Sequence, residues 1–247
     1  MQKILFFVAV LFSIVLLSFP TYAQDSSDTE EQDQKTTNKV YSDFNLSVGV
    51  YQDGFSGAIA YSRLYPIAFK KRFYVGYGVR FTSYFGKNGD YVTAPANVSE
   101  GNFFKPQNEE KLDTLFMPTA QINSLNAAIF LMYKFTPKFS VGFNIDAIGF
   151  SFGKDQTSTF YSYSENIPAT TSNASVTNFN LLLTGDYDIG SLNSEIYAHY
   201  DASEKIAIRA GASFIFSEYT TDQKFAFDND RFRKKSLGFM LGVAYKL

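Results

Sequence analysis

Hydrophobic and polar residues alternate with a period of two along most of the chain, and the last segment shows this most clearly. From Leu237 to Leu247, every second residue is large and apolar, and the residues between them are mostly small. A period of two places successive side chains on opposite faces of a strand, whereas a helix needs spacings of three and four. One face of this strand carries Leu237, Phe239, Leu241, Val243, Tyr245 and Leu247.

The same alternation recurs upstream and predicts eight strands in all. In the segment 58–65 the two faces stay unassigned, because both phases carry apolar residues. The segments 58–65 and 193–200 alternate less regularly than the others. The predicted strands are 44–51, 58–65, 73–82, 124–135, 139–146, 193–200, 206–217 and 237–247.

The connections between these strands are of two kinds. Three are short turns that would lie at one end of a sheet: 66–71, 136–138 and 201–205. At the other end only 53–57 is short, and three connections are long: 87–120, 154–192 and 220–233. This asymmetry is typical of up-and-down membrane barrels. We therefore predict an all-β fold, an up-and-down antiparallel transmembrane β-barrel of eight strands, with ten as the alternative count.

The polar face of these strands indicates which way the barrel faces. It consists mostly of Gly, Ala, Ser, Thr and Asn with single charges, which would make a poor surface against water. Small residues suit the interior of a narrow barrel, and the apolar face suits contact with lipid. We expect the apolar side chains to point outward into a membrane. A soluble secreted ligand-binding barrel, with its apolar face inside, is the alternative.

The first 39 residues do not alternate. Residues 1–23 combine a basic start, an apolar run too short for the ~20 residues of a spanning helix, and a small residue at Ala23. They predict a signal peptide cleaved after Ala23. Residues 24–39 contain no aliphatic or aromatic side chain and predict a disordered acidic leader. The barrel domain is expected to span 40–247.

Composition removes several classes of function. The 247 residues include no Cys and one His, which excludes disulfides, thiolate sites and centres with several His ligands. The net charge of −2 gives no positive field that would attract nucleic acid. No metal, cofactor or catalytic site is predicted. Charged residues make up 19%, below the roughly 25% of soluble domains, and aromatic residues make up 18%.

Together, the signal peptide, the alternating strands, the unequal connections and the apolar final strand resemble small outer-membrane β-barrel proteins of Gram-negative bacteria, of the OmpA- or OmpX-like eight-stranded type. The resemblance covers 40–247 and carries no catalytic signature. It implies residence in the outer membrane, contact with outer-membrane lipid, and handling by periplasmic chaperones and the barrel-assembly machinery. In that family the machinery reads the last strand, and Phe239, Leu241, Val243, Tyr245 and Leu247 match its pattern. Leu247 departs from the usual terminal Phe.

The inward face would hold a small set of charges. We expect them to pair and to fill a narrow lumen as a structural network, because an eight-stranded barrel has little interior room and an unpaired buried charge is costly. A hairpin centred near Ser203 would place Glu195 opposite Gly211 and diagonal to Arg209. The network residues are Arg80, Asp146, Glu195, His199 and Arg209.

Two further functions stay open at this point. The inward charges could line a path for ions or small solutes, which makes a channel the first alternative. His199 with Glu195 resembles half of an acid–base pair, as in outer-membrane lipid-modifying enzymes. However, its inward phase and its place near a short turn favour a structural, hydrogen-bonded histidine. We therefore expect no enzyme activity.

Specific function would reside in the long connections. Segments 112–117 and 179–183 are more apolar than a solvated loop requires. They would extend the strands or fold over the barrel mouth, or they would form a docking surface for an unknown ligand. Phe179 to Leu183 could also be a missed strand. The expected role is structural or interactive, through surface loops.

Overall fold

The computed structural model describes residues 40–69, 71–100, 107–165, 167–183 and 185–247. The predicted signal peptide and leader lie outside these residues. Eleven strands form one antiparallel sheet: β1 Tyr41–Tyr51, β2 Gly54–Ala68, β3 Phe73–Thr93, β4 Thr114–Lys134, β5 Phe139–Gly153, β6 Gln156–Tyr161, β7 Thr170–Val176, β8 Phe179–Leu181, β9 Leu192–Asp201, β10 Ile206–Thr221 and β11 Arg231–Lys246. Short helical turns are α3 Ala96–Ser99, η1 Glu109–Lys111, η2 Gly185–Tyr187 and η3 Ala226–Asp228.

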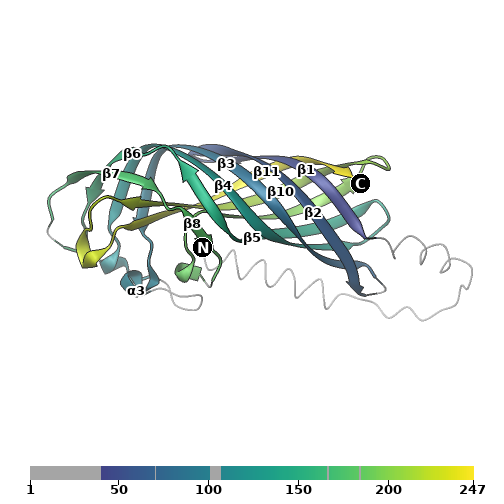
Figure 1. Ribbon diagram of the computed structural model, residues 1–247, viewed down its shortest axis with the longest axis horizontal. Coiled ribbons are helices and arrows are strands. Elements are labelled where there is room, and N and C mark those ends of the chain that lie inside the picture. Colours follow the sequence, from purple (N-terminus) through teal and green to yellow (C-terminus); the bar gives the residue numbers. More distant parts are fainter. Residues whose placement is uncertain (1–39, 70, 101–106, 166, 184) are drawn as a thin grey trace, which may run out of the picture. The chain divides into compact units, whose positions relative to one another are not determined.

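Eight of these strands close into a ring. Strands β1 to β5 pair in chain order, β5 pairs with β9, and β9, β10 and β11 follow in order. The ring closes because β11 pairs with β1 over nine residue pairs, from Asp43–Lys246 to Tyr51–Gly238. The three short turns and the C-terminus lie at the right-hand end in Figure 1. The predicted all-β, up-and-down barrel of eight strands is confirmed.

The apolar face of this ring points outward. On β1, Phe44, Leu46, Val48 and Val50 are 50–60% exposed, whereas Asp43, Asn45 and Ser47 between them are buried. On β2, which the sequence left unassigned, Ile59 points outward and Ala58 and Ala60 point inward. The outside of the ring is therefore apolar. Its interior holds polar and charged side chains and, nearer the short turns, one apolar cluster made by Tyr41, Ala60, Leu64, Tyr74, Ala128, Phe130 and Met132.

The strands are longer, and the loops shorter, than the sequence predicted. Strand β3 continues to Thr93 and β4 begins at Thr114, so that both ends of the predicted loop 87–120 are sheet. Likewise, much of the predicted loop 154–192 forms β6, β7 and β8. The connections that remain at this end are 94–113, 162–169 and 222–230.

Strands β5 to β8 form one long hairpin. The register runs from Phe160–Thr170 through Gln156–Ala174 to Phe150–Phe179, with little change in spacing. Strand β9 then takes over the pairing with β5 after the intervening segment 182–191, which includes η2. The suspected strand at Phe179 is therefore real, but it continues an existing strand and leaves the ring of eight unchanged.

Above the β1–β2 turn the sheet narrows to a second, smaller ring. Strands β3, β4, β6, β7, β10 and β11 continue upward, and β3 pairs directly with β11 at Thr93–Phe232 and Val92–Arg233. Strands β1 and β2 take no part because their turn ends at Gln52 and Asp53. The molecule thus has a ring of eight strands and a ring of six strands. We call the first the lower ring, towards the right-hand end of Figure 1, and the second the upper ring, towards its left-hand end.

The alternation changes phase where the two rings meet. On β3, Tyr84 and Gly86 point inward, Lys87 and Asn88 are both exposed, and Tyr91 then points inward. Asn88 has a left-handed φ of 49°. On β4, the facing position is Pro118, which has no N–H to donate to the sheet. At Asn88 on β3 and at Pro118 on β4, the alternation of inward and outward side chains therefore shifts by one residue.

The upper ring encloses an apolar core. In contrast to the lower ring, its outward positions are polar, with Asp90, Thr157, Thr171 and Asn173 exposed. The core residues are Tyr51, Tyr84, Tyr91, Leu115, Met117, Ala120, Ile122, Phe160, Ala174, Val176, Ile215, Tyr219 and Phe232. The upper ring thus has its apolar side chains inside, as in a water-soluble β-barrel, whereas the lower ring has its largest apolar band outside.

Candidate functional site

The lumen of the lower ring brings four of the five predicted network residues together. Arg80 on β3 contacts Asp146 on β5 with Nη2 at 2.6 Å and Nε at 2.9 Å from Oδ1. Both side chains are almost fully buried. The second oxygen of Asp146 accepts from the Asn126 amide at 2.8 Å and from the backbone N–H of Asn193 at 2.9 Å. These contacts satisfy both carboxylate oxygens without water.

Glu195 joins this pair to Arg209. Its Oε2 lies 3.5 Å from Arg80 Nη1 and 3.3 Å from Arg209 Nη2, and Oε1 accepts from the Ser47 hydroxyl at 3.1 Å. The Arg209 guanidinium also lies 3.6 Å from the centre of the Tyr197 ring. Because β1, β3 and β9 are not neighbours in the ring, these contacts cross the lumen.

The predicted register of the β9–β10 hairpin was wrong. Glu195 lies opposite Ser213, and Tyr197 lies opposite Gly211. The hairpin is therefore offset by two residues from one centred near Ser203. Arg209 still reaches Glu195, because its long side chain spans the extra distance along the barrel.

His199 belongs to a separate cluster near the short-turn end. Its Nε2 lies 3.1 Å from Asp201 Oδ1 and 3.4 Å from the Tyr41 hydroxyl, which donates to Asp43 at 3.0 Å. Lys246 lies 3.1 Å from the same Asp201 oxygen. His199 is buried and makes no contact with the Glu195 carboxylate, so the acid–base pair suggested by the sequence does not form.

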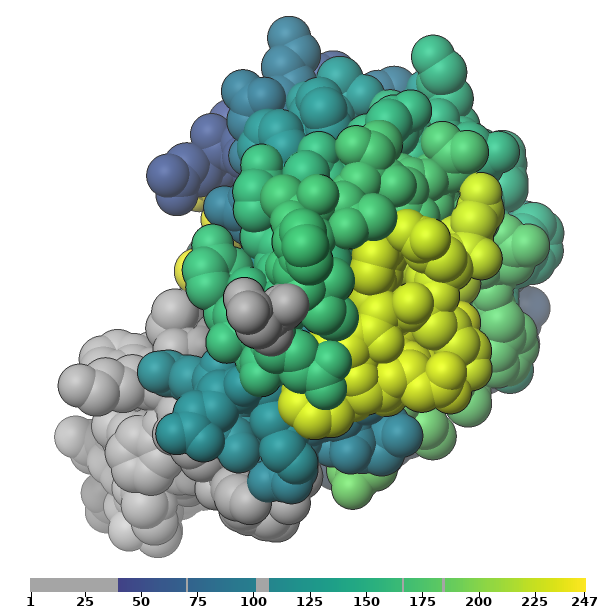
Figure 2. All heavy atoms as spheres, turned by 90° about the vertical axis from the view of Figure 1, so that its left-hand side faces the viewer, coloured from purple at the N-terminus to yellow at the C-terminus, as the bar shows by residue number. Residues whose placement is uncertain are grey.

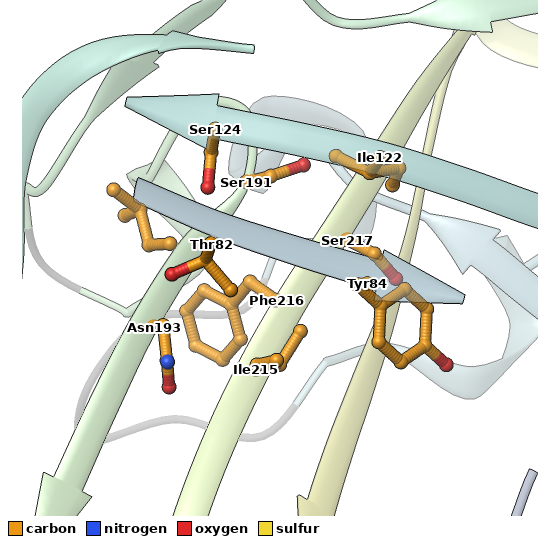
Figure 3. Close-up of a pocket in the computed structure, with 10 residues that line it drawn as sticks. Thr82, Tyr84, Ile122, Ser124, Ser191, Asn193, Ile215, Phe216 and Ser217 are labelled. Carbon is orange, nitrogen blue, oxygen red and sulfur yellow. The ribbon is translucent and has the colours of Figure 1, made fainter. Parts of the chain in front are cut away.

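A small cavity of about 10 Å³ is lined by Asn193, which contacts Asp146 of the charge network, and by Tyr84, Ile122 and Ile215 of the upper apolar core (Figure 3). Thr82, Ser124, Ser191, Asn193 and Ser217 contribute polar atoms to its wall. The Thr82 hydroxyl is buried and has no hydrogen bond to the described protein atoms. A cavity of this size has room for about one water molecule, which the hydroxyl could bind.

A second buried charge cluster lies higher, on the outer side of β10 and β11, and was not predicted. Glu218 is fully buried and binds Arg233 at 2.7 Å and Arg231 at 2.8 Å. Arg233 donates to the backbone oxygen of Asp188, and Glu218 accepts from the Gly190 N–H at 3.2 Å. These contacts fasten the segment 182–191 against the hairpin.

Two further contacts belong to this cluster. Lys235 binds Asp186 in η2 at 2.6 Å. Burial raises the pKa of the Asp188 carboxyl, whereas the hydrogen bond from the Leu183 N–H and the nearby Arg233 charge oppose that rise. The cluster escaped prediction because its members are divided between two segments that the sequence assigned largely to loops.

Buried contacts hold two of the connections at the upper end. The Asp113 carboxylate is 2% exposed and accepts four hydrogen bonds from Ser162, Tyr163 and Ser164, which fix the start of the β6–β7 connection. In the β10–β11 connection, Phe225 stacks on Phe160 with ring centres 4.0 Å apart. Seen end-on, the side chains of these two connections, green and yellow, meet across the molecule (Figure 2).

The predicted assembly signal lies on the outer face of β11. Phe239, Leu241, Val243 and Tyr245 are 44–58% exposed, and Leu247 is 65% exposed. Among the described residues, no cluster of His, Asp or Glu has the makings of a metal site. No helix in the described part of the chain is long and apolar enough to cross a membrane.

No protein-family model matches the chain, and no curated protein matches it. Among solved structures, it is similar to Neisserial surface protein A (12% identity, TM-score 0.35), covering 84% of this chain and 96% of that one. It is also similar to the attachment invasion locus protein of Yersinia pestis (11%, TM-score 0.32, 84% and 96% covered) and to a major outer membrane protein from Thermus thermophilus (11%, TM-score 0.36, 83% and 99% covered). The assignment of the fold rests on the strand pairing of this chain: it is the fold of an outer-membrane β-barrel.

Proposed function

We propose that this protein is an integral outer-membrane β-barrel with a closed lumen, which acts as a structural or surface-interaction protein through its upper ring. The observation that carries the proposal is the band of exposed apolar side chains around the lower ring, whose interior holds the buried charge network. In water this band would be a large apolar surface, whereas lipid accepts it without cost.

The closed lumen is supported by two layers of packing. The Arg80–Asp146–Glu195–Arg209 network crosses the interior of the lower ring with almost no exposure. Above it, Leu115, Phe160, Tyr219 and Phe232 fill the upper ring and are each 0% exposed. An ion would have to separate buried charge pairs and then cross an apolar core, and both steps are costly.

The interaction role is supported by the build of the upper end. Six strands carry the connections well beyond the apolar band, and buried contacts such as those of Asp113 hold these connections in place. Loops positioned by a rigid scaffold are where binding residues concentrate. No catalytic role is proposed for His199, because it is buried among Asp201 and Tyr41 at the opposite end.

The direct test of membrane residence is fractionation of expressing cells, followed by gel mobility of heated and unheated protein. We expect the chain in the outer-membrane fraction, with a mobility that shifts on heating as a folded barrel opens. Recovery of folded, monodisperse protein from detergent-free aqueous extracts would contradict the proposal.

Two further measurements separate the alternatives. In planar bilayers we expect no steady conductance, whereas regular open-channel currents from the pure protein would favour a channel. In cells that express the protein we expect an unchanged mass spectrum of outer-membrane lipids. A new acylated or deacylated species, lost in a His199→Ala variant, would instead indicate a lipid-modifying enzyme.

A further inference from the structure

The wall of the barrel has a lateral opening where the two rings meet. On one side of β11, residues 238–246 pair with β1, and Phe232 and Arg233 pair with β3. Within the described chain, residues 234–237 between them have no strand partner on that side. Strand β3 likewise leaves β2 at Gly86 and meets β11 at Val92. The gap between these strands lies directly above the β1–β2 turn. We call it the window.

The window is an open surface pocket of about 1080 Å³ with a defined lower rim. The β1–β2 turn forms this rim, where the backbone N–H of Lys87 donates to the backbone oxygen of Asp53 at 2.9 Å. Gly54 allows the close approach, because a Cβ there would lie 2.2 Å from the Phe85 oxygen. Lys234 lines the window, pairs with Asp53 and lies against Gly89.

The lining of the window changes character with height. Below the opening lie the last outward apolar side chains of four strands: Val50, Phe55, Phe85 and Leu237, which are 37–60% exposed. Phe55 and Phe85 stack with ring centres 5.2 Å apart. At and above it lie polar residues: Gln52, Asp53, Lys87, Asn88, Asp90, Lys234, Lys235 and Ser236. The window therefore sits at the boundary where the acyl chains of an amphiphile would meet its head group.

The charges favour an anionic head group. Lys234 forms an ion pair with Asp53, and Lys235 forms one with Asp186, so that the charges within each pair cancel. Lys87 is exposed and has no carboxylate within ion-pair distance among the described residues. Asp90 is the opposing charge, and it lies higher, next to the β3–β11 pairing. Lys87, two residues after Phe85, is thus the unpaired cation of the window's lining that lies nearest along the chain to the apolar rim.

We propose that the window binds the head group of a phosphorylated glycolipid of the outer leaflet. Lys87 would contact a phosphate, and the Phe55–Phe85 stack would contact an acyl chain. Gln52, Asn88 and the unpaired backbone of β3 and β11 offer both donors and acceptors, as sugar hydroxyls require. This proposal rests on the proposed residence in the outer membrane.

The test is native mass spectrometry of the full chain in zwitterionic detergent, titrated with diphosphoryl lipid A, phosphatidylglycerol or inorganic phosphate. We expect bound diphosphoryl lipid A, with phosphatidylglycerol retained several-fold less. Lys87→Glu replaces attraction by repulsion and should weaken lipid A binding about tenfold. The matched control is Lys205→Glu, on an exposed turn at the opposite end, which should leave binding unchanged.

Each other outcome overturns the proposal. Equal losses in the two variants, or no loss in Lys87→Glu, would remove the window as the site. Phosphatidylglycerol binding as tightly as lipid A would exclude glycolipid recognition, and displacement of lipid A by inorganic phosphate would indicate a free-anion site. All variants must first show the heat-dependent gel shift. If the parent protein lacks that shift, the proposed function fails; if the shift is present and lipid A is not retained, only the window proposal fails.

Discussion

The lower and upper rings use the same strands in opposite ways. Strands β3, β4, β10 and β11 run through both rings. In the lower ring their apolar side chains are exposed and Arg80 and Arg209 are buried, whereas in the upper ring Leu115 and Phe232 are buried and the outer face is polar. The phase break at Asn88 and Pro118 marks the change. A period of two thus identifies a strand, but the medium around the strand decides which face is apolar.

The largest expected effect on the free energy of unfolding comes from disrupting the charge network inside the lower ring. Asp146→Ala leaves the Arg80 guanidinium buried without its main partner and should lower the free energy of unfolding by about 3–5 kcal/mol. The measurement is urea unfolding in lipid vesicles. The control is the double variant Arg80→Met with Asp146→Leu, which removes both charges and should recover much of the loss. An Asp146→Ala protein as stable as the parent would show that the network is not structural.

A substitution in the apolar core of the upper ring should cost a comparable amount of stability, but it should leave the lower ring folded. Phe160→Ala removes a 0% exposed ring that stacks on Phe225 and should cost about 3–5 kcal/mol. Hydrogen exchange should speed up in β6, β7 and the tip of β10, while β1 and β2 stay protected. Tyr161→Ala, on the outer face of the same strand, is the control. Uniform deprotection of both rings would mean that they unfold as one unit.

The outer faces should differ in their response to charge. Leu241→Arg places a guanidinium at mid-strand on the apolar face and should destabilise the protein in vesicles by about 2–4 kcal/mol. Thr157→Arg, on the outer face of the upper ring, should change little. Unfolding measurements on both variants test this difference. Equal effects would mean that the two faces meet the same solvent.

The smallest effect is expected at the upper loops. Asp113→Ala removes the acceptor of four hydrogen bonds and should cost about 1–3 kcal/mol, felt chiefly as loosening of the β6–β7 connection. Limited proteolysis near Tyr163 should be faster than in the parent. The exposed Asp222→Ala serves as the control. Unchanged cleavage in Asp113→Ala would show that the carboxylate does not order the loop.

The sequence predicted the lower ring well because most of its strands alternate without a break, whereas the faces of 58–65 could not be assigned. The order of the eight strands and the outward face of β11 both follow from period-two placement. The upper extensions of β3 and β4 were missed because these two strands break phase at Asn88 and Pro118, so that residues beyond them no longer continued the pattern. The Glu218 cluster was missed with it, because its partners meet only through the fold of segment 182–191.

The central claim is that the lower ring faces lipid and the upper ring faces water. The chain contains no Cys, so a single cysteine can carry a nitroxide label without competition. The most direct measurement is the collision rate of that label with oxygen and with a water-soluble nickel complex, at Val48→Cys and at Thr171→Cys, in reconstituted protein. We expect the label at Val48 to collide mainly with oxygen and the label at Thr171 mainly with nickel. Equal access of nickel to both positions in the folded protein would contradict the account.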